Sequence, residues 1–225
     1  MIPQFRVSVR ISVDLTKVPP IPWDLIHTED GLVSNRDYWY MKGIGWKAYK
    51  LVSTIEEKAI AFIDSQTKTH EEFEELAEKL ITDPQWSELN ELQGLDLGIA
   101  SVVFALYAFG CFPITSCRGH PPPTAGERHP LVVFYARPER APLIVGVAAG
   151  SGVGICNEWA DGEGALIVFG SNIIDMRKFA IGLHHAFPAV SASMAQRAKL
   201  ASGSANSIQP CTKPNNITKL DRWLT

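Results

Sequence analysis

A thiol, a guanidinium and an imidazole occur within four consecutive residues of this chain, at Cys117, Arg118 and His120. They follow an apolar stretch and precede three prolines, as expected for a turn at the end of a strand. A thiolate becomes a nucleophile near neutral pH when a cation or an imidazolium lies beside it. The sequence therefore predicts a site at this turn, with Cys117 as the candidate nucleophile and His120 or His129 as the candidate base.

An anion site is the interpretation that we prefer, because it requires no nucleophile. Arg118 supplies a cation, Gly119 a permissive turn and His120 a second hydrogen-bond donor. We expect Arg118 and His120 at the rim of a pocket rather than in the core. Further candidate ligand-binding residues are Ser116, Arg137 and Glu158. The structural alternative is a turn with a buried Cys117 and a surface ion pair at Arg118.

The same turn has one half of a zinc-binding pattern. Cys117 and His120 have the spacing of a ligand pair, and His129 and Cys156 are further candidate ligands. The second half of the pattern lacks a matched pair, so the sequence predicts no metal at this turn. No motif identifies a cofactor or an oligomeric state.

Composition describes an ordinary globular chain of 225 residues, 46% hydrophobic, with a formal net charge of −3. This charge provides no global basic field that would attract nucleic acid. The cysteines form no C-x-x-C pair, and the chain starts with polar residues such as Gln4 and Arg6 instead of a signal peptide. Both observations favour free thiols in a reducing cytoplasm. The longest apolar run, 97–112, is too short to span a bilayer, so we expect no membrane association.

The first part of the chain predicts one strand and two main helices. Apolar and polar residues alternate over 5–13, which indicates a half-buried strand. Residues 46–65 follow a helical period, and Thr69 with Glu72 forms a capping box that opens a second helix. The first helix has an apolar stripe of Leu51, Ile55, Ala59, Phe62 and Ile63. The second has an acidic face that we expect to be solvated, formed by Glu71, Glu72, Glu74, Glu75 and Glu78.

The second part predicts the core. Asp96 is the expected N-cap of an apolar helix over 97–109, and Gly110 fits its C-terminal end. Alternating strands and helices then follow, at 112–117, 131–136, 140–149, 155–159, 165–169 and 173–184. The order α-β-β-α-β-β-α predicts an α/β or α+β fold with a mixed sheet covered by helices. The predicted organisation is an N-terminal strand and helical region (1–95), an α/β core (96–187) and an extended tail (188–225).

Two segments of the core carry a resemblance. Residues 115–120, Thr-Ser-Cys-Arg-Gly-His, are preceded by a helix end at 105–110, Ala-Leu-Tyr-Ala-Phe-Gly. This arrangement resembles a group of uncharacterised bacterial and phage proteins with a helix-Gly-strand-Ser-Cys-x-Gly-His segment. It is more remotely similar to the tRNA wybutosine-synthesising methyltransferase family, which has Ser-Ser-Cys-Ser-Gly-Arg at a comparable strand end. Over about 96–183 the resemblance implies a similar order of elements and a site centred on Ser116, Cys117, Arg118 and His120.

Two classes of function fit these observations. In the first, the protein is an enzyme or a binding protein for a phosphorylated or nucleic-acid-derived ligand, such as a nucleotide or RNA. In the second, it is a non-catalytic subunit of a bacterial multi-protein system, such as a defence system. Its protein partner would then dock on the aromatic and basic segment 36–49 and on the tail. A concave pocket at the turn favours the first class, and a flat apolar patch favours the second.

Overall fold

The computed structural model describes residues 1–23, 43–120, 129–157 and 164–188. The chain divides into two compact units, Met1–Phe187 and Pro188–Thr225. Glu158, residues 36–42 of the aromatic segment and the tail beyond 188 lie outside the described residues, so the predictions made for them stay predictions.

A mixed five-stranded sheet forms the centre of the first unit, in the order β1-β4-β5-β3-β2. β1 runs parallel to β4, and the other neighbouring strands are antiparallel. The central strand β5 and its neighbour β3 are buried along their whole length. The strands are β1 (Ile11–Ser12), β2 (Phe112–Cys117), β3 (Leu131–Tyr135), β4 (Gly154–Cys156) and β5 (Leu166–Phe169).

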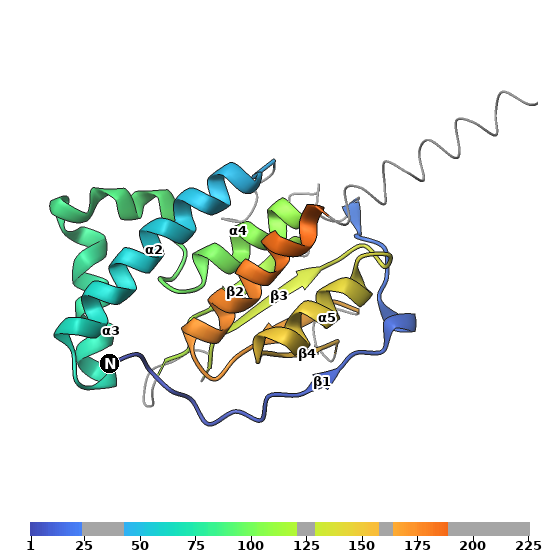
Figure 1. The fold of residues 1–225 in the computed structure, drawn as a ribbon, viewed down its shortest axis with the longest axis horizontal. Helices are drawn as coiled ribbons and strands as arrows, with labels where there is room; N and C mark the ends of the chain where they lie inside the picture. The colour runs from blue at the N-terminus through green and yellow to red at the C-terminus, as the bar shows by residue number, and fades with distance from the viewer. Residues whose placement is uncertain (24–42, 121–128, 158–163, 189–225) are drawn as a thin grey trace, which may run out of the picture. The chain divides into compact units, whose positions relative to one another are not determined.

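Helices accompany this sheet, which confirms the predicted fold class (Figure 1). The helices are α2 (Trp46–Gln66), α3 (His70–Thr82), α4 (Ala100–Phe109), α5 (Ala141–Ser151) and helix 173–188, with 3-10 turns at η1 (Leu15–Lys17) and η3 (Pro84–Leu92). α4 packs on α2 and β2, and α5 packs on β4 and β1. Nearly every residue of α4 is buried, as its apolar sequence predicts.

The N-terminal segment is more irregular than its alternating sequence predicts. The expected strand over 5–13 is reduced to Ile11–Ser12, because β4 offers only three residues and pairs with β1 at these two positions. Figure 1 shows the segment (dark blue) running from beside α3 to β1 at the edge of the sheet. The prediction of a long half-buried strand is therefore wrong.

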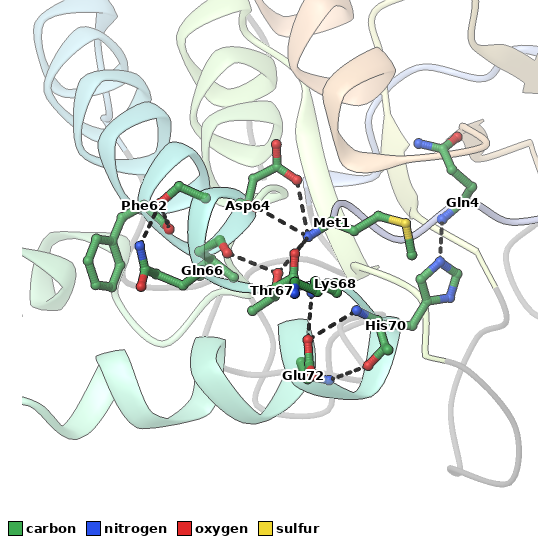
Figure 2. Close-up of polar contacts among 12 residues, drawn as sticks. Met1, Gln4, Phe62, Asp64, Gln66, Thr67, Lys68, His70 and Glu72 are labelled. Atoms are coloured by element: carbon green, nitrogen blue, oxygen red, sulfur yellow. Dashed lines mark hydrogen bonds and ion pairs between the residues drawn. The ribbon is translucent and has the colours of Figure 1, made fainter.

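The start of this segment is tied to the connection between α2 and α3 (Figure 2). The amino group of Met1 lies 3.2 Å from a carboxylate oxygen of Asp64 and 2.6 Å from the carbonyl oxygen of Thr67. The backbone N–H of Gln4 donates to Nε2 of His70 over 3.2 Å. These contacts fix the first residues on the side of the molecule where α3 begins.

The buried face of α2 is rotated relative to the predicted stripe. Ile55, Ala59 and Ile63 are buried as expected, whereas Leu51 is 50% exposed and Phe62 is 39% exposed. The ring of Phe62 contacts the ring of Trp86 in η3 instead, with centroids 5.1 Å apart. The buried face is completed by Tyr49, Val52, Glu56 and Ile60.

A carboxylate from α2 caps α4, and Asp96 does not. The helix begins at Ala100, and its N-cap residue Ile99 provides no side-chain hydrogen bond. The fully buried Glu56 accepts hydrogen bonds from the backbone N–H groups of Gly98 (2.8 Å) and Ser101 (3.1 Å). The predicted cap at Asp96 is therefore wrong, because a tertiary contact supplies the acceptor. Gly110 ends the helix in the left-handed conformation, at φ 82°, as predicted.

Candidate functional site

The turn after β2 is fixed by close backbone packing. Cys117 is the last residue of β2 and pairs with Leu131 at the start of β3. Gly119 has φ 81°, and a Cβ atom there would lie 2.7 Å from the Cα atom of His129. Only glycine fits this combination of positive φ and close approach. The turn is thereby held against the chain that enters β3.

Arg118 is buried beneath this turn, and the prediction that it lies at a pocket rim is wrong. Its side chain is 2% exposed. Nη2 donates to Oε2 of Glu74 over 2.6 Å and to Oε1 of Glu78 over 2.7 Å, and Nε donates to the same Glu74 oxygen over 3.2 Å. The guanidinium is therefore already paired with two carboxylates of α3 and is not presented to an anion.

The charges around Arg118 keep it protonated. Burial by itself would lower the pKa of the guanidinium. The carboxylates of Glu74 and Asp96, together with the hydrogen bonds from Glu74 and Glu78, more than offset burial and raise the pKa above its ordinary value. Arg118 is thus a permanent internal cation that neutralises part of the acidic face of α3.

That acidic face is only partly solvated, which corrects the sequence-based expectation. Glu71 and Glu75 are exposed as expected, but Glu74 is half-buried and binds Arg118 together with Glu78. The two carboxylates are one helical turn apart, so they lie on the same side of α3. The i,i+4 spacing of Glu74 and Glu78 indicated that both carboxylates could bind one cation, but nothing in the sequence identified Arg118 as that cation.

Three potential metal ligands converge at the turn: Asp96, Cys117 and His120. One ligand atom from each lies within 4.8 Å of the others, and all three side chains are half-buried. We call these three residues the donor cluster. Asp96 precedes α4, and the chain reverses direction at Gly110 before it forms β2. The end of β2 therefore lies beside the start of α4, and Cys117 lies near Asp96. Sequence reasoning missed Asp96 because we assigned it to the helix cap.

Each member of the donor cluster has a hydrogen-bonding partner. The backbone N–H of Arg118 donates to Oδ2 of Asp96 over 3.0 Å. The backbone N–H of Gly119 donates to Sγ of Cys117 over 3.3 Å. Nδ1 of His120 lies 3.3 Å from Oε2 of Glu74, the oxygen that also binds Arg118. The turn and α3 therefore fix the orientation of all three donors.

The remaining predicted site residues do not all join this cluster. His129 lies beside Gly119, and its ring packs edge-on against Phe169 with centroids 5.8 Å apart. Ser116 precedes Cys117 in β2 and is half-buried. Arg137 is exposed after the far end of β3, and Cys156 lies on β4, which β5 and β3 separate from β2. The structure thus does not bring Arg137 or Cys156 to the turn.

A cavity of about 380 Å³ lies elsewhere, at the edge of the sheet formed by β1. Its lining residues are Ile11, Ser12, Val13, Asp14, Lys17 and Asn157. β1 and β2 are the two opposite edges of the sheet, so this cavity is remote from the donor cluster. The predicted pocket around Arg118 and His120 does not coincide with it.

The three described cysteines are free thiols in different surroundings. Burial raises the pKa of Cys111 to about 12, whereas Cys117 is half-exposed. We expect a maleimide to modify Cys117 in the native protein within minutes and to leave Cys111 unmodified. Peptide mass spectrometry after labelling at pH 8 in metal-free buffer measures both sites. Faster modification of Cys111 than of Cys117 would contradict the packing described here.

No protein-family model matches the chain, and searches of curated proteins and of solved structures find no similar protein. Within the described part of the chain, no helix combines the length and apolar character needed to cross a membrane.

Proposed function

We propose that the protein binds a phosphorylated or nucleic-acid-derived ligand at the donor cluster and that a divalent cation accompanies this ligand. The convergence of Asp96, Cys117 and His120 supports the location, since side chains from two separate stretches of the chain meet at one half-buried point. Polar side chains that converge in this way are typical of binding and catalytic sites.

The surrounding charges support the role of the cation. Asp96, Glu74 and Glu78 place three carboxylates around the turn, and Arg118 is the buried cation that they share. Because the carboxylates outnumber the guanidinium, a bare phosphate group would meet repulsion here. A bound divalent cation reverses the local charge and can coordinate phosphate oxygens directly.

Adenosine 5′-monophosphate and inorganic phosphate are suitable probes for this proposal. We expect calorimetry to detect binding of adenosine 5′-monophosphate when Mg²⁺, Mn²⁺ or Zn²⁺ is present and none in EDTA. Asp96→Asn should weaken this binding at least about tenfold, since it removes one charge from the cation's surroundings. The exposed Glu71→Gln is the matched control and should leave the affinity unchanged. Equal binding in EDTA, or no binding with any cation, would refute the proposal.

The N-terminal segment supports the second candidate function, docking to a protein partner. Its large exposed apolar side chains include Val9, Ile11 and Leu15, each between 40% and 44% exposed. Scattered exposed apolar residues are normal, but these three lie in β1 or within three residues of it, at one edge of the sheet. This surface does not involve the donor cluster, so nucleotide binding separates the two candidates.

A further inference from the structure

We infer that the protein itself holds the cation: Asp96, Cys117 and His120 form a three-ligand site for a transition-metal ion, for which Zn²⁺ is the best match. This inference goes beyond the proposed function, because a metal ion can bind in the absence of any other ligand. It rests on the kind of donor atoms, on their partners and on two buried polar atoms beside them.

The donor set selects the class of metal. A thiolate, an imidazole and a carboxylate are ligands for Zn²⁺ and related transition metals, whereas Mg²⁺ and Ca²⁺ prefer oxygen alone. Tetrahedral Zn²⁺ with bonds of about 2.0–2.3 Å places its ligand atoms roughly 3.3–3.8 Å apart. The donor atoms here lie within 4.8 Å of one another, so a small rotation of the half-buried side chains closes the site.

The hydrogen bonds around the cluster match those of established metal sites. Metal-bound histidines commonly donate their second ring N–H to a carboxylate or a carbonyl, which fixes the tautomer. His120 has such a partner, because its Nδ1 lies 3.3 Å from Oε2 of Glu74, and Nε2 would then be the metal ligand. Arg118 joins two of the ligands: its backbone N–H binds Asp96, and its guanidinium holds Glu74 against His120.

Two buried polar atoms beside the cluster indicate a further polar occupant. Oε1 of Glu74 and Nη1 of Arg118 are buried without a hydrogen-bond partner among the described residues. The Arg118 side chain is 2% exposed, so bulk water does not solvate it. Buried polar atoms nearly always have a partner. Ordered water or ligand atoms around a bound metal ion would satisfy them.

Three protein ligands leave one tetrahedral position open. Structural zinc sites are closed by four protein ligands, whereas catalytic sites keep a position for water or substrate. The sequence lacks a second ligand pair, and this absence, which argued against a metal, is compatible with an open site. The fourth position is where an oxygen of the proposed ligand would bind.

Calorimetric titration of Zn²⁺ alone into the reduced, metal-free protein tests the inference. We expect one equivalent to bind. Cys117→Ser and His120→Ala should each weaken binding more than about 100-fold, beyond the roughly 10- to 100-fold that loss of an outer partner costs. Asp96→Asn retains an oxygen that can accept from the Arg118 N–H, so it removes the charged ligand with little change to the turn. His185→Ala, which removes an exposed imidazole, is the control and should change nothing.

The outcomes separate this inference from the proposed function. Circular dichroism of each variant establishes that it is folded before its affinity is compared. Absence of Zn²⁺ binding to the wild type, or an affinity equal to that of the wild type in all three folded variants, would overturn the metal site. Zinc binding through these residues without binding of adenosine 5′-monophosphate would support the metal site and refute the proposed ligand.

Discussion

Replacing Arg118 with alanine is expected to lower the free energy of unfolding by about 3–5 kcal/mol. The guanidinium is almost completely buried and binds Glu74 and Glu78, so its removal leaves the half-buried Glu74 carboxylate without its main partner. Losing one member of such a pair costs more than losing both. Urea denaturation followed by circular dichroism measures the change.

Two further variants make this prediction specific. Lys79→Ala removes an exposed cation from α3, the helix of Glu74 and Glu78, and should change stability by less than about 0.5 kcal/mol. Arg118→Ala combined with Glu74→Gln should be less destabilised than the sum of the single variants, because the uncompensated carboxylate is then absent. A loss below about 1 kcal/mol for Arg118→Ala alone would be incompatible with a buried ion pair at this position.

Replacing Glu56 with alanine should cost a similar amount, about 3–5 kcal/mol. Glu56 is fully buried and accepts the backbone N–H groups of Gly98 and Ser101 at the start of α4. Its carboxylate also lies 4.0 Å from Nε of Arg177, which would lose its only buried charge partner among the described residues and keep the exposed Glu57 at 3.5 Å. The matched control is Glu75→Ala on the exposed side of α3, which should leave stability nearly unchanged.

The same residue predicts a dependence of stability on pH. Burial raises the pKa of Glu56 above its ordinary value of 4.5, despite the opposing hydrogen bonds and the charge of Arg177. The folded state then binds this proton more tightly than the unfolded state. Its contribution to stability is complete below about pH 4.5 and is lost as the pH rises through the folded-state pKa. Glu56→Gln, which cannot ionise, should lack this decline; an identical pH profile for wild type and variant would contradict the assignment.

Local signals predicted the elements that frame the candidate site. The apolar residues after Gly110 predicted a strand over 112–117, and β2 has these limits, Phe112–Cys117, in the structure. Thr69 and Glu72 form the predicted capping box, and Asn172 caps helix 173–188 by accepting from the backbone N–H of Asp175. These features depend on residues that are close in the sequence, so they can be recognised without the fold.

The contacts that define the donor cluster could not be predicted in this way. Arg118 meets Glu74 across 44 positions of the chain, and the Arg118 N–H meets Asp96 across 22. Both contacts depend on how α3 and α4 pack beside the end of β2, which no local pattern encodes. Glu56 was missed for the same reason, although a charged residue within the apolar face of α2 was a visible exception to its pattern.

X-ray absorption spectroscopy of the zinc-loaded protein is the most direct test of the metal site. The donor cluster predicts one sulfur ligand at about 2.3 Å and three nitrogen or oxygen ligands at about 2.0–2.1 Å, the fourth being water. In Cys117→Ser the sulfur contribution should disappear while any remaining zinc has only nitrogen and oxygen neighbours. A spectrum of the wild type without sulfur, or with two or more sulfur ligands, would contradict a site built from Asp96, Cys117 and His120.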